Sequence, residues 1–125
     1  MQEKCFNTKG TKGIKMKFEE YIKECKKTYA WQGLPDIEVC MLCMGLAGET
    51  GEIVDYLKKV GFQGHELDKE KLKTEMGDLM WYFAMLSDFF GLKFEDILQS
   101  NINKLRKRYP GGFDAEKSKN RGEND

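Results

Sequence analysis

The sequence predicts an all-α protein, a four- to five-helix bundle that oligomerisation completes. Two long stretches, 37–60 and 69–90, repeat apolar residues at intervals of three and four, which is the spacing of one helix face. Nowhere do apolar and polar residues alternate for long enough to predict a strand. The chain of 125 residues, 40% of them hydrophobic, suits one domain with its own core.

The first half of the chain divides into an arm and two helices. Residues 1–16 show little periodicity and predict a flexible N-terminal arm. From Lys17 onward apolar residues recur at helical spacing, so the first helix is expected to begin there. A Gly-Leu-Pro-Asp segment interrupts the pattern, and Asp36 is expected to cap the following helix, 37–60.

Two further helices complete the predicted domain, which covers 17–112. A glycine-containing loop at 61–68 leads into the helix 69–90, whose stripe of large apolar residues predicts a homo-oligomer. The last helix, 94–109, ends before a Pro-Gly-Gly run. Residues 113–125 are polar and charged and predict an extended or disordered C-terminal tail.

The charge balance excludes some classes of partner. The chain carries 21 Lys and Arg against 21 Asp and Glu, so it has no global attraction to nucleic acid or to an anionic membrane. We therefore expect neither as a partner. No apolar run approaches the ~18–20 residues of a membrane span, and the basic start lacks the apolar core of a secretory signal. The cytoplasm is the expected location.

Four cysteines admit a zinc site as one interpretation. Cys40 and Cys43 are three residues apart, which is a metal-ligand spacing on a helix. Because His65 is the only histidine, such a site would also need Cys25 and Cys5. Small buried thiols in a reducing compartment are the favoured interpretation.

Carboxylates interrupt the apolar pattern of both long helices. Glu49 lies at the centre of an apolar helix face, with Glu52 at the edge of that face. Glu75 and Asp78 repeat this three-residue spacing on the second helix. A buried carboxylate shifts its pKa, pairs with a cation or binds a metal. Two facing pairs of oxygen ligands favour a hard divalent cation, Mg²⁺, with Mn²⁺ as a substitute.

Several alternatives to a magnesium centre stay open at this point. The carboxylates can be buried partners of Lys or Arg, with a structural role only. A di-iron bundle is disfavoured, because Glu52 and Asp78 stand where Glu-x-x-His motifs would place histidine. Three glycines between 45 and 51 suggest a helix that another backbone or a ligand approaches closely. A loop followed by a helix that starts at Thr50 is the other interpretation.

The helix 94–109 carries a polar stripe beside its apolar one. Asn101, Lys104 and Arg108 fall within about 60° of one direction at 3.6 residues per turn. Lysine neutralises phosphate as a point charge, and arginine binds it through two hydrogen bonds. An ordinary basic helix end is the alternative, since cations are favourable there. Beside a carboxylate–metal centre, the stripe would form the second half of a polyphosphate site.

These motifs, in this order, resemble those of the MazG-like nucleotide pyrophosphohydrolases. The family signature is Glu-x-x-Glu, a variable gap and Glu-x-x-Asp, and here the gap is 22 residues. The matching acids are Glu49, Glu52, Glu75 and Asp78. The stretch 101–110, which contains Asn-x-x-Lys-Leu and Arg-Tyr-Pro, and the following Gly-Phe-Asp also resemble the family. The similarity covers roughly residues 40–121.

The resemblance implies a fold of the all-α NTP pyrophosphatase type, usually a dimer or tetramer. It implies hydrolysis of ribo- or deoxyribonucleoside triphosphates to monophosphate and pyrophosphate, by attack of water at the α-phosphorus. The alternatives are a non-catalytic nucleotide-binding or regulatory module, and a hydrolase of another pyrophosphate-containing nucleotide metabolite.

Roles for individual residues follow from the same resemblance. The four acids would coordinate Mg²⁺, and Glu49 or Glu52 would take the proton of the attacking water. Family positions that contact phosphate match Lys58, Asn101, Lys104, Arg108 and Tyr109. Independently of the family, Trp81 or Trp31 could stack on the base.

Overall fold

The computed structural model describes residues 16–120, and all of its regular elements in that range are helices. They are α1 (Phe18–Lys27), α2 (Pro35–Phe62), α3 (Lys69–Phe89), α4 (Phe94–Arg108) and α5 (Ala115–Lys119). The predicted all-α class is confirmed. The predicted N-terminal arm lies, apart from its last residue, outside the described residues. None of the helices between residues 16 and 120 has the length and apolar character that crossing a membrane requires.

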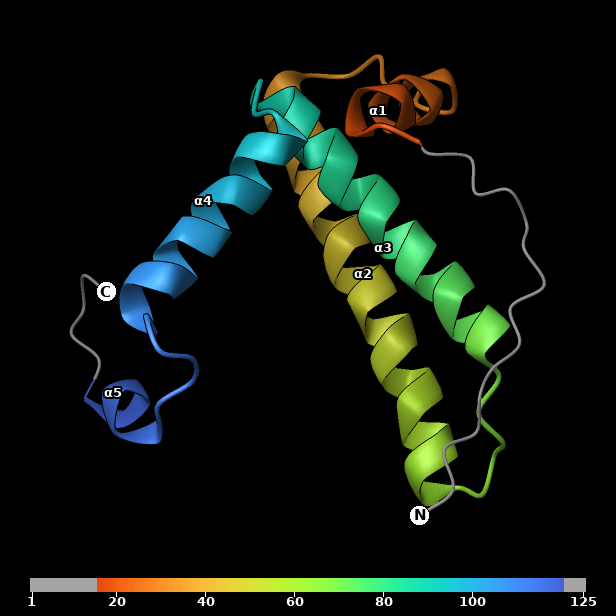
Figure 1. Ribbon diagram of the computed structural model, residues 1–125. Helices are drawn as coiled ribbons and strands as arrows, with labels where there is room; N and C mark the ends of the chain where they lie inside the picture. Colours follow the sequence, from red (N-terminus) through yellow and green to blue (C-terminus); the bar gives the residue numbers. More distant parts are fainter. Residues whose placement is uncertain (1–15, 121–125) are drawn as a thin grey trace.

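α2 and α3 form a long antiparallel pair (Figure 1). At the hairpin end, the Tyr56 hydroxyl accepts a hydrogen bond from the Asp68 N–H at 2.7 Å and donates one to the Asp68 carbonyl at 3.2 Å. Asp68 also caps α3, since its side chain accepts hydrogen bonds from the first-turn N–H groups. Further along, a Cβ atom on Gly45 would lie 2.0 Å from the Tyr82 ring. The missing side chain therefore permits the close approach of the two helices.

α2 is continuous through its glycines and longer than predicted. The segment 45–51 is helical throughout, so the loop interpretation is wrong. The helix extends to Phe62 and takes in the start of the predicted loop. Its N-cap is Leu34, followed by Pro35 in the first turn. The prediction that Asp36 is the cap is wrong, because proline starts the helix two residues earlier than the apolar pattern indicates.

α1 packs against α3 and holds the protein's small core. Four buried residues form this core: Cys25, Leu42, Ala84 and Met85. Around it, the Trp81 Nε1–H donates a hydrogen bond to the Thr28 hydroxyl at 2.9 Å. Lys26 and Asp88 form an ion pair at 3.0 Å. α1 is thereby fixed on one side of the α2–α3 pair.

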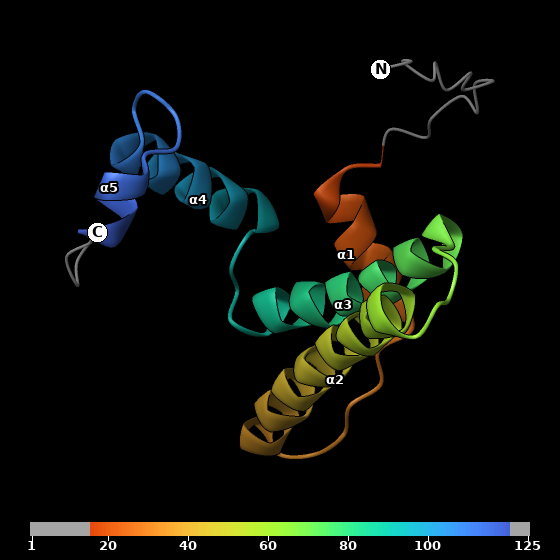
Figure 2. The same ribbon diagram turned by 90° about the horizontal axis from the view of Figure 1, so that it is seen from below.

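α4 begins beside the first turn of α1 and then projects away from the α2–α3 pair (Figures 1 and 2). Gly91, with φ of 63°, provides the left-handed turn after α3. At the start of α4, the buried Phe94 packs against Phe18 and Phe83, with ring centroids 4.8 and 5.4 Å apart. Further along α4, three large apolar residues are exposed: Leu98, Ile102 and Leu105. One chain therefore does not close the bundle over α4.

The C-terminal segment contains a short helix where we expected an extended tail. α5 forms because the Asp114 side chain accepts hydrogen bonds from the N–H groups of Glu116 and Lys117, at 2.9 and 3.1 Å. Side-chain capping of this kind stabilises even a short helix. The polar composition that suggested an extended tail does not report on such a cap.

Candidate metal centre

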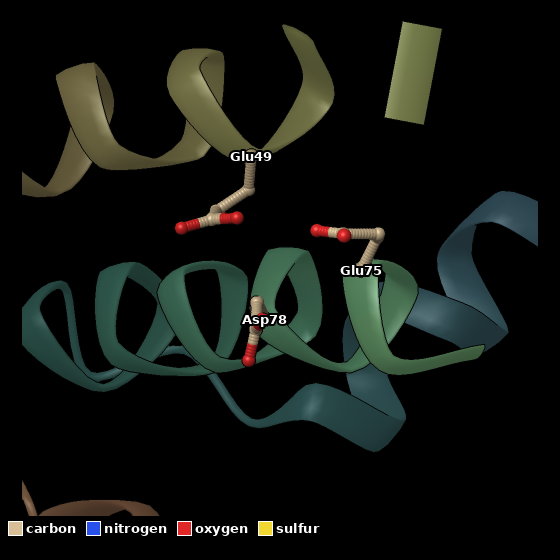
Figure 3. Close-up of side chains that lie close together, drawn as sticks. All are labelled: Glu49, Glu75 and Asp78. Atoms are coloured by element: carbon tan, nitrogen blue, oxygen red, sulfur yellow. The ribbon is translucent and has the colours of Figure 1, made fainter. Parts of the chain in front are cut away.

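Three carboxylates from the two long helices converge between them (Figure 3). Glu49 points from α2 toward α3, which supplies Glu75 and Asp78. One oxygen atom from each residue lies within 4.8 Å of the others. The convergence follows from helix geometry, since Glu49 occupies the inner face of α2 and residues three apart share a face of α3.

The carboxylates of this cluster are negative charges held close together, and they repel one another. Glu49 is partly buried, and burial is the first cause that raises its pKa. The negative charges of Asp78, Glu75 and Glu52 raise the pKa of Glu49 further, in that order. Within residues 16–120, none of the ion pairs formed with Lys or Arg includes these acids. The buried ion pairs of the structural alternative are therefore absent from that range.

Glu52 stands slightly apart from the other three acids. It is exposed, and the three-oxygen group does not include it. Its charge nevertheless reaches Glu49, whose pKa it helps to raise. It also acts on Lys59, whose pKa is raised chiefly by Asp55 and to a smaller extent by Glu52. Glu52 thus interacts with both the carboxylate cluster and Lys59, which lies about two turns further along α2.

Of the neighbouring Lys58 and Lys59, which the resemblance does not separate, Lys59 is the one whose pKa Glu52 helps to raise. Lys58 comes nine residues after Glu49, and at 3.6 residues per turn this places it about 180° around the helix. Both lysines form ion pairs with Asp55, at 2.5 Å for Lys58 and 2.6 Å for Lys59. The angle of each residue around the helix distinguishes the two lysines, since Lys59 lies on the same side of α2 as Glu52 and Lys58 does not.

Trp81 and Trp31 have packing roles. Trp81 is half-buried between α1 and α3, where its Nε1–H binds Thr28 and its ring lies 5.7 Å from that of Tyr29. The Trp31 ring covers Gly33, which has no room for a side chain. Trp81 thus contributes to the packing around α1, and Trp31 to the packing of the connection between α1 and α2.

The predicted phosphate contacts of the last helix lie away from the three-oxygen group. Asn101 and Lys104 line an open hollow of about 790 Å³ between α4 and the end of α3. Arg108 ends α4, and Tyr109 follows it with its ring 5.6 Å from that of Phe113. Figure 1 shows α4 projecting away from the α2–α3 pair, and the group of three carboxylates includes no residue of α4.

The zinc interpretation finds no support among the described residues. Cys25 is buried in the core, whereas Cys40 and Cys43 are exposed on α2. Cys5 lies outside the described range. Between residues 16 and 120, the one group of three or more possible ligands is the carboxylate cluster. Its donors are all oxygen atoms, which suits a hard cation such as Mg²⁺ and not a thiophilic metal.

An all-α fold with facing Glu-x-x-Glu and Glu-x-x-Asp motifs defines a class of acidic, helix-built centres. The comparison with protein families places the chain within that class. The family model described as the MazG nucleotide pyrophosphohydrolase domain matches residues 40–113, more than half of the chain. The chain belongs to this family, and the predicted resemblance is confirmed.

Two relatives show how far the similarity extends. The Gene 37 protein of Mycobacterium phage L5 is 38% identical over 74 residues, which are 55% of this chain and 64% of the phage protein. The uncharacterized protein YvdC of Bacillus subtilis (strain 168) is 39% identical over 41 residues, which are 33% and 39% of the two chains. The chain thus spans less than two thirds of either relative. No solved structure matches significantly.

Proposed function

We propose that the protein hydrolyses nucleoside triphosphates to the monophosphate and pyrophosphate, with Mg²⁺ held by the carboxylate cluster. The observation that supports this proposal most is the convergence of Glu49, Glu75 and Asp78 without a protein cation beside them within residues 16–120. Family membership supports the class of reaction.

The donor set fits a divalent cation. Three carboxylate oxygens within 4.8 Å of one another repel, and this repulsion adds to burial in raising the pKa of Glu49. A divalent cation would remove the repulsion and leave positions for water and phosphate oxygens. When bound, it would neutralise the triphosphate and polarise the α-phosphoryl group.

The protein's own residues divide the remaining work. We assign Glu49, Glu75 and Asp78 to binding the cation. We assign Glu52 to accepting the proton of the attacking water, because it is exposed and lies outside the three-oxygen group.

The test is a panel of ribo- and deoxyribonucleoside triphosphates incubated with Mg²⁺ in water enriched in ¹⁸O. Attack at the α-phosphorus predicts monophosphate and pyrophosphate as products, with the heavy oxygen in the monophosphate. Release of orthophosphate, or label in the pyrophosphate, would contradict the proposed bond cleavage. A chelator should stop turnover, and restored Mg²⁺ or Mn²⁺ should recover it.

A further inference from the structure

The face of the α2–α3 pair that carries the carboxylate cluster continues toward the hairpin between the two helices (Figure 1). On α3, Lys71 lies one turn before Glu75 and two turns before Asp78, about 40° and 20° from them around the helix. On α2, Tyr56 lies two turns beyond Glu49 and about 20° from it. The same face therefore carries the acids and, nearer the hairpin, Lys71 and Tyr56.

A cation–π contact holds Lys71 against α2. Its Nζ atom lies 4.8 Å from the centre of the Tyr56 ring. The ring is itself fixed, because Tyr56 is buried and its hydroxyl accepts and donates hydrogen bonds at the Asp68 backbone. A lysine side chain has much rotamer freedom to lose when it binds a ligand. The contact with Tyr56 restricts that freedom beforehand, which reduces the entropic cost of binding.

The charge of Lys71 is not matched by an acid of the protein. Among the described residues, none of the ion pairs includes Lys71. Lys59, three residues after Tyr56 on α2, instead pairs with Asp55 at 2.6 Å. Lys71 also stands in the first turn of α3, where the positive end of the helix dipole disfavours a cation. The position therefore suits an anion that comes from outside the protein.

The proposed reaction brings anionic groups to this position. Water attacks the α-phosphorus, so the α-phosphate lies at the carboxylates and their cation. The β- and γ-phosphates extend beyond it, and Lys71 is only about 6 Å from Glu75 along the axis of α3. When the bond between the α-phosphorus and the bridging oxygen breaks, its electron pair leaves with pyrophosphate. A cation beside that group offsets the charge that it gains.

We propose that Lys71 binds the terminal phosphates of the triphosphate, so that the polyphosphate lies along the α2–α3 pair with its free end toward the hairpin. The inference rests on the proposed function and adds a substrate-binding residue to its site. The ligand class is a linear polyphosphate bound together with a divalent cation. Lys71 holds it through the charge and the hydrogen bonds of its ammonium group.

Calorimetric titration with inorganic tripolyphosphate in excess Mg²⁺ tests this contact without a base, a sugar or turnover. In Lys71→Met, the side chain keeps an apolar stem over the Tyr56 ring and loses its charge. The Kd for tripolyphosphate should rise about 10-fold in this variant, and Lys71→Arg should stay within about threefold of wild type. An unchanged Kd in Lys71→Met, with the helices intact by circular dichroism, would overturn the proposal.

Lys73 offers a matched control on the same helix. It lies about 160° from Lys71 around α3 and forms an exposed ion pair with Glu70. Lys73→Met removes the same charge, but it should change the Kd for tripolyphosphate by less than about twofold, because salt screens a charge on the far side of the helix. Equal losses in Lys71→Met and Lys73→Met would show a response to net charge alone and would overturn the proposal.

Protection from chemical modification locates the contact and separates this inference from the proposed function. Wild-type protein is acetylated with an N-hydroxysuccinimide ester, and mass spectrometry measures the rate at each lysine. Tripolyphosphate with Mg²⁺ should slow the modification of Lys71 and leave that of Lys73 unchanged. Such protection in a protein that hydrolyses no nucleotide would support this inference and contradict the proposed function. Nucleotide hydrolysis by a protein whose Lys71 is not protected would overturn this inference alone.

Discussion

Glu49 and Asp55 lie on the same helix, six residues apart, and their carboxylates have opposite surroundings. Asp55 has two lysines within 2.6 Å, and its hydrogen bonds to them lower its pKa to about 2. Glu49 has three other acids as electrostatic neighbours, and its pKa is raised. The first arrangement is complete in the protein alone, whereas the second lacks positive charge.

The comparison shows how a ligand site differs from a structural charge. α2 contains lysines that pair with Asp55, so the chain is able to supply counter-ions where it needs them. Glu49 is positioned against α3 instead, where the nearest charges are acids. Folding places these like charges together at a cost to stability, and a bound cation would offset that cost.

The largest expected effect is the difference in turnover between variants of Glu49 and of Asp55. Glu49→Gln should reduce turnover by about 100-fold or more, because a metal ligand is lost. Asp55→Asn makes the same charge change on the same helix and should alter turnover only by about threefold or less. Steady-state rates at saturating nucleotide measure both, with circular dichroism to confirm the helices. Equal losses in the two variants would show that Glu49 has no special role.

Mg²⁺ should stabilise the folded protein, and this stabilisation should depend on Glu49 and not on Asp55. Mg²⁺ at 100 times its Kd should stabilise the wild-type fold by about 2.7 kcal/mol through linkage. The same concentration should stabilise Asp55→Asn equally and Glu49→Gln much less. Thermal unfolding with and without Mg²⁺ measures the difference. A wild-type protein that is indifferent to Mg²⁺, Mn²⁺ and Ca²⁺ alike would rule out the cluster as a cation site.

The carboxylate cluster also requires that α2 and α3 approach each other closely. Substitutions at two glycines of α2 test this approach. Gly45→Ala pushes a methyl group into the Tyr82 ring and should destabilise the protein by about 1–3 kcal/mol. Gly48→Ala meets no atom within 4 Å and should stabilise it by up to ~1 kcal/mol through helix propensity. Urea titration of both variants measures the contrast. Equal effects would mean that α2 and α3 do not pack as closely as described.

The smallest effect is a difference in the sign of the pH dependence without metal. Because burial and the neighbouring acids raise the pKa of Glu49, its charge destabilises the fold above that pKa, so Glu49→Gln should stabilise the metal-free protein at pH 7. This gain should vanish as the pH falls below about 4.3, the unfolded value. The pKa of Asp55 is lowered to about 2, so its stabilisation is present above about pH 4 and lost toward pH 2.

Asp55→Asn should therefore lower stability at neutral pH, and its difference from wild type should shrink in acid. Urea midpoints measured from pH 7 to pH 2.5 follow both variants. The same sign of change in both at pH 7 would contradict the contrast between the two carboxylates.

Much of the fold was predictable from periodicity because each long helix has a defined apolar face. α3 and α4 begin where predicted and end within one residue of the prediction. The errors came from local chemistry that periodicity does not contain. Pro35 started α2 early, and Asp114 capped a helix in a segment whose composition is simply polar. Caps and proline positions need separate attention in such sequences.

The candidate site was predictable in part for the same reason. The positions of Glu49, Glu75 and Asp78 on inner faces followed from helical angles, and the structure brings them together. The separation of Glu52 from the three-oxygen group depends on how α2 and α3 pack, which the pattern of a single helix does not determine. Whether these acids bind metal and which of them accepts a proton stay predictions.

By itself, the sequence determined the helices and the side of each that carries the carboxylates, because both depend on neighbours within a few residues. Only the tertiary structure decided that α4 begins beside α1 and then projects away from the α2–α3 pair. That choice depends on contacts such as Phe94 with Phe18 and Phe83, which join residues distant in the chain. It separates the cations of α4 from the acids of the same chain, a relation that no local pattern encodes.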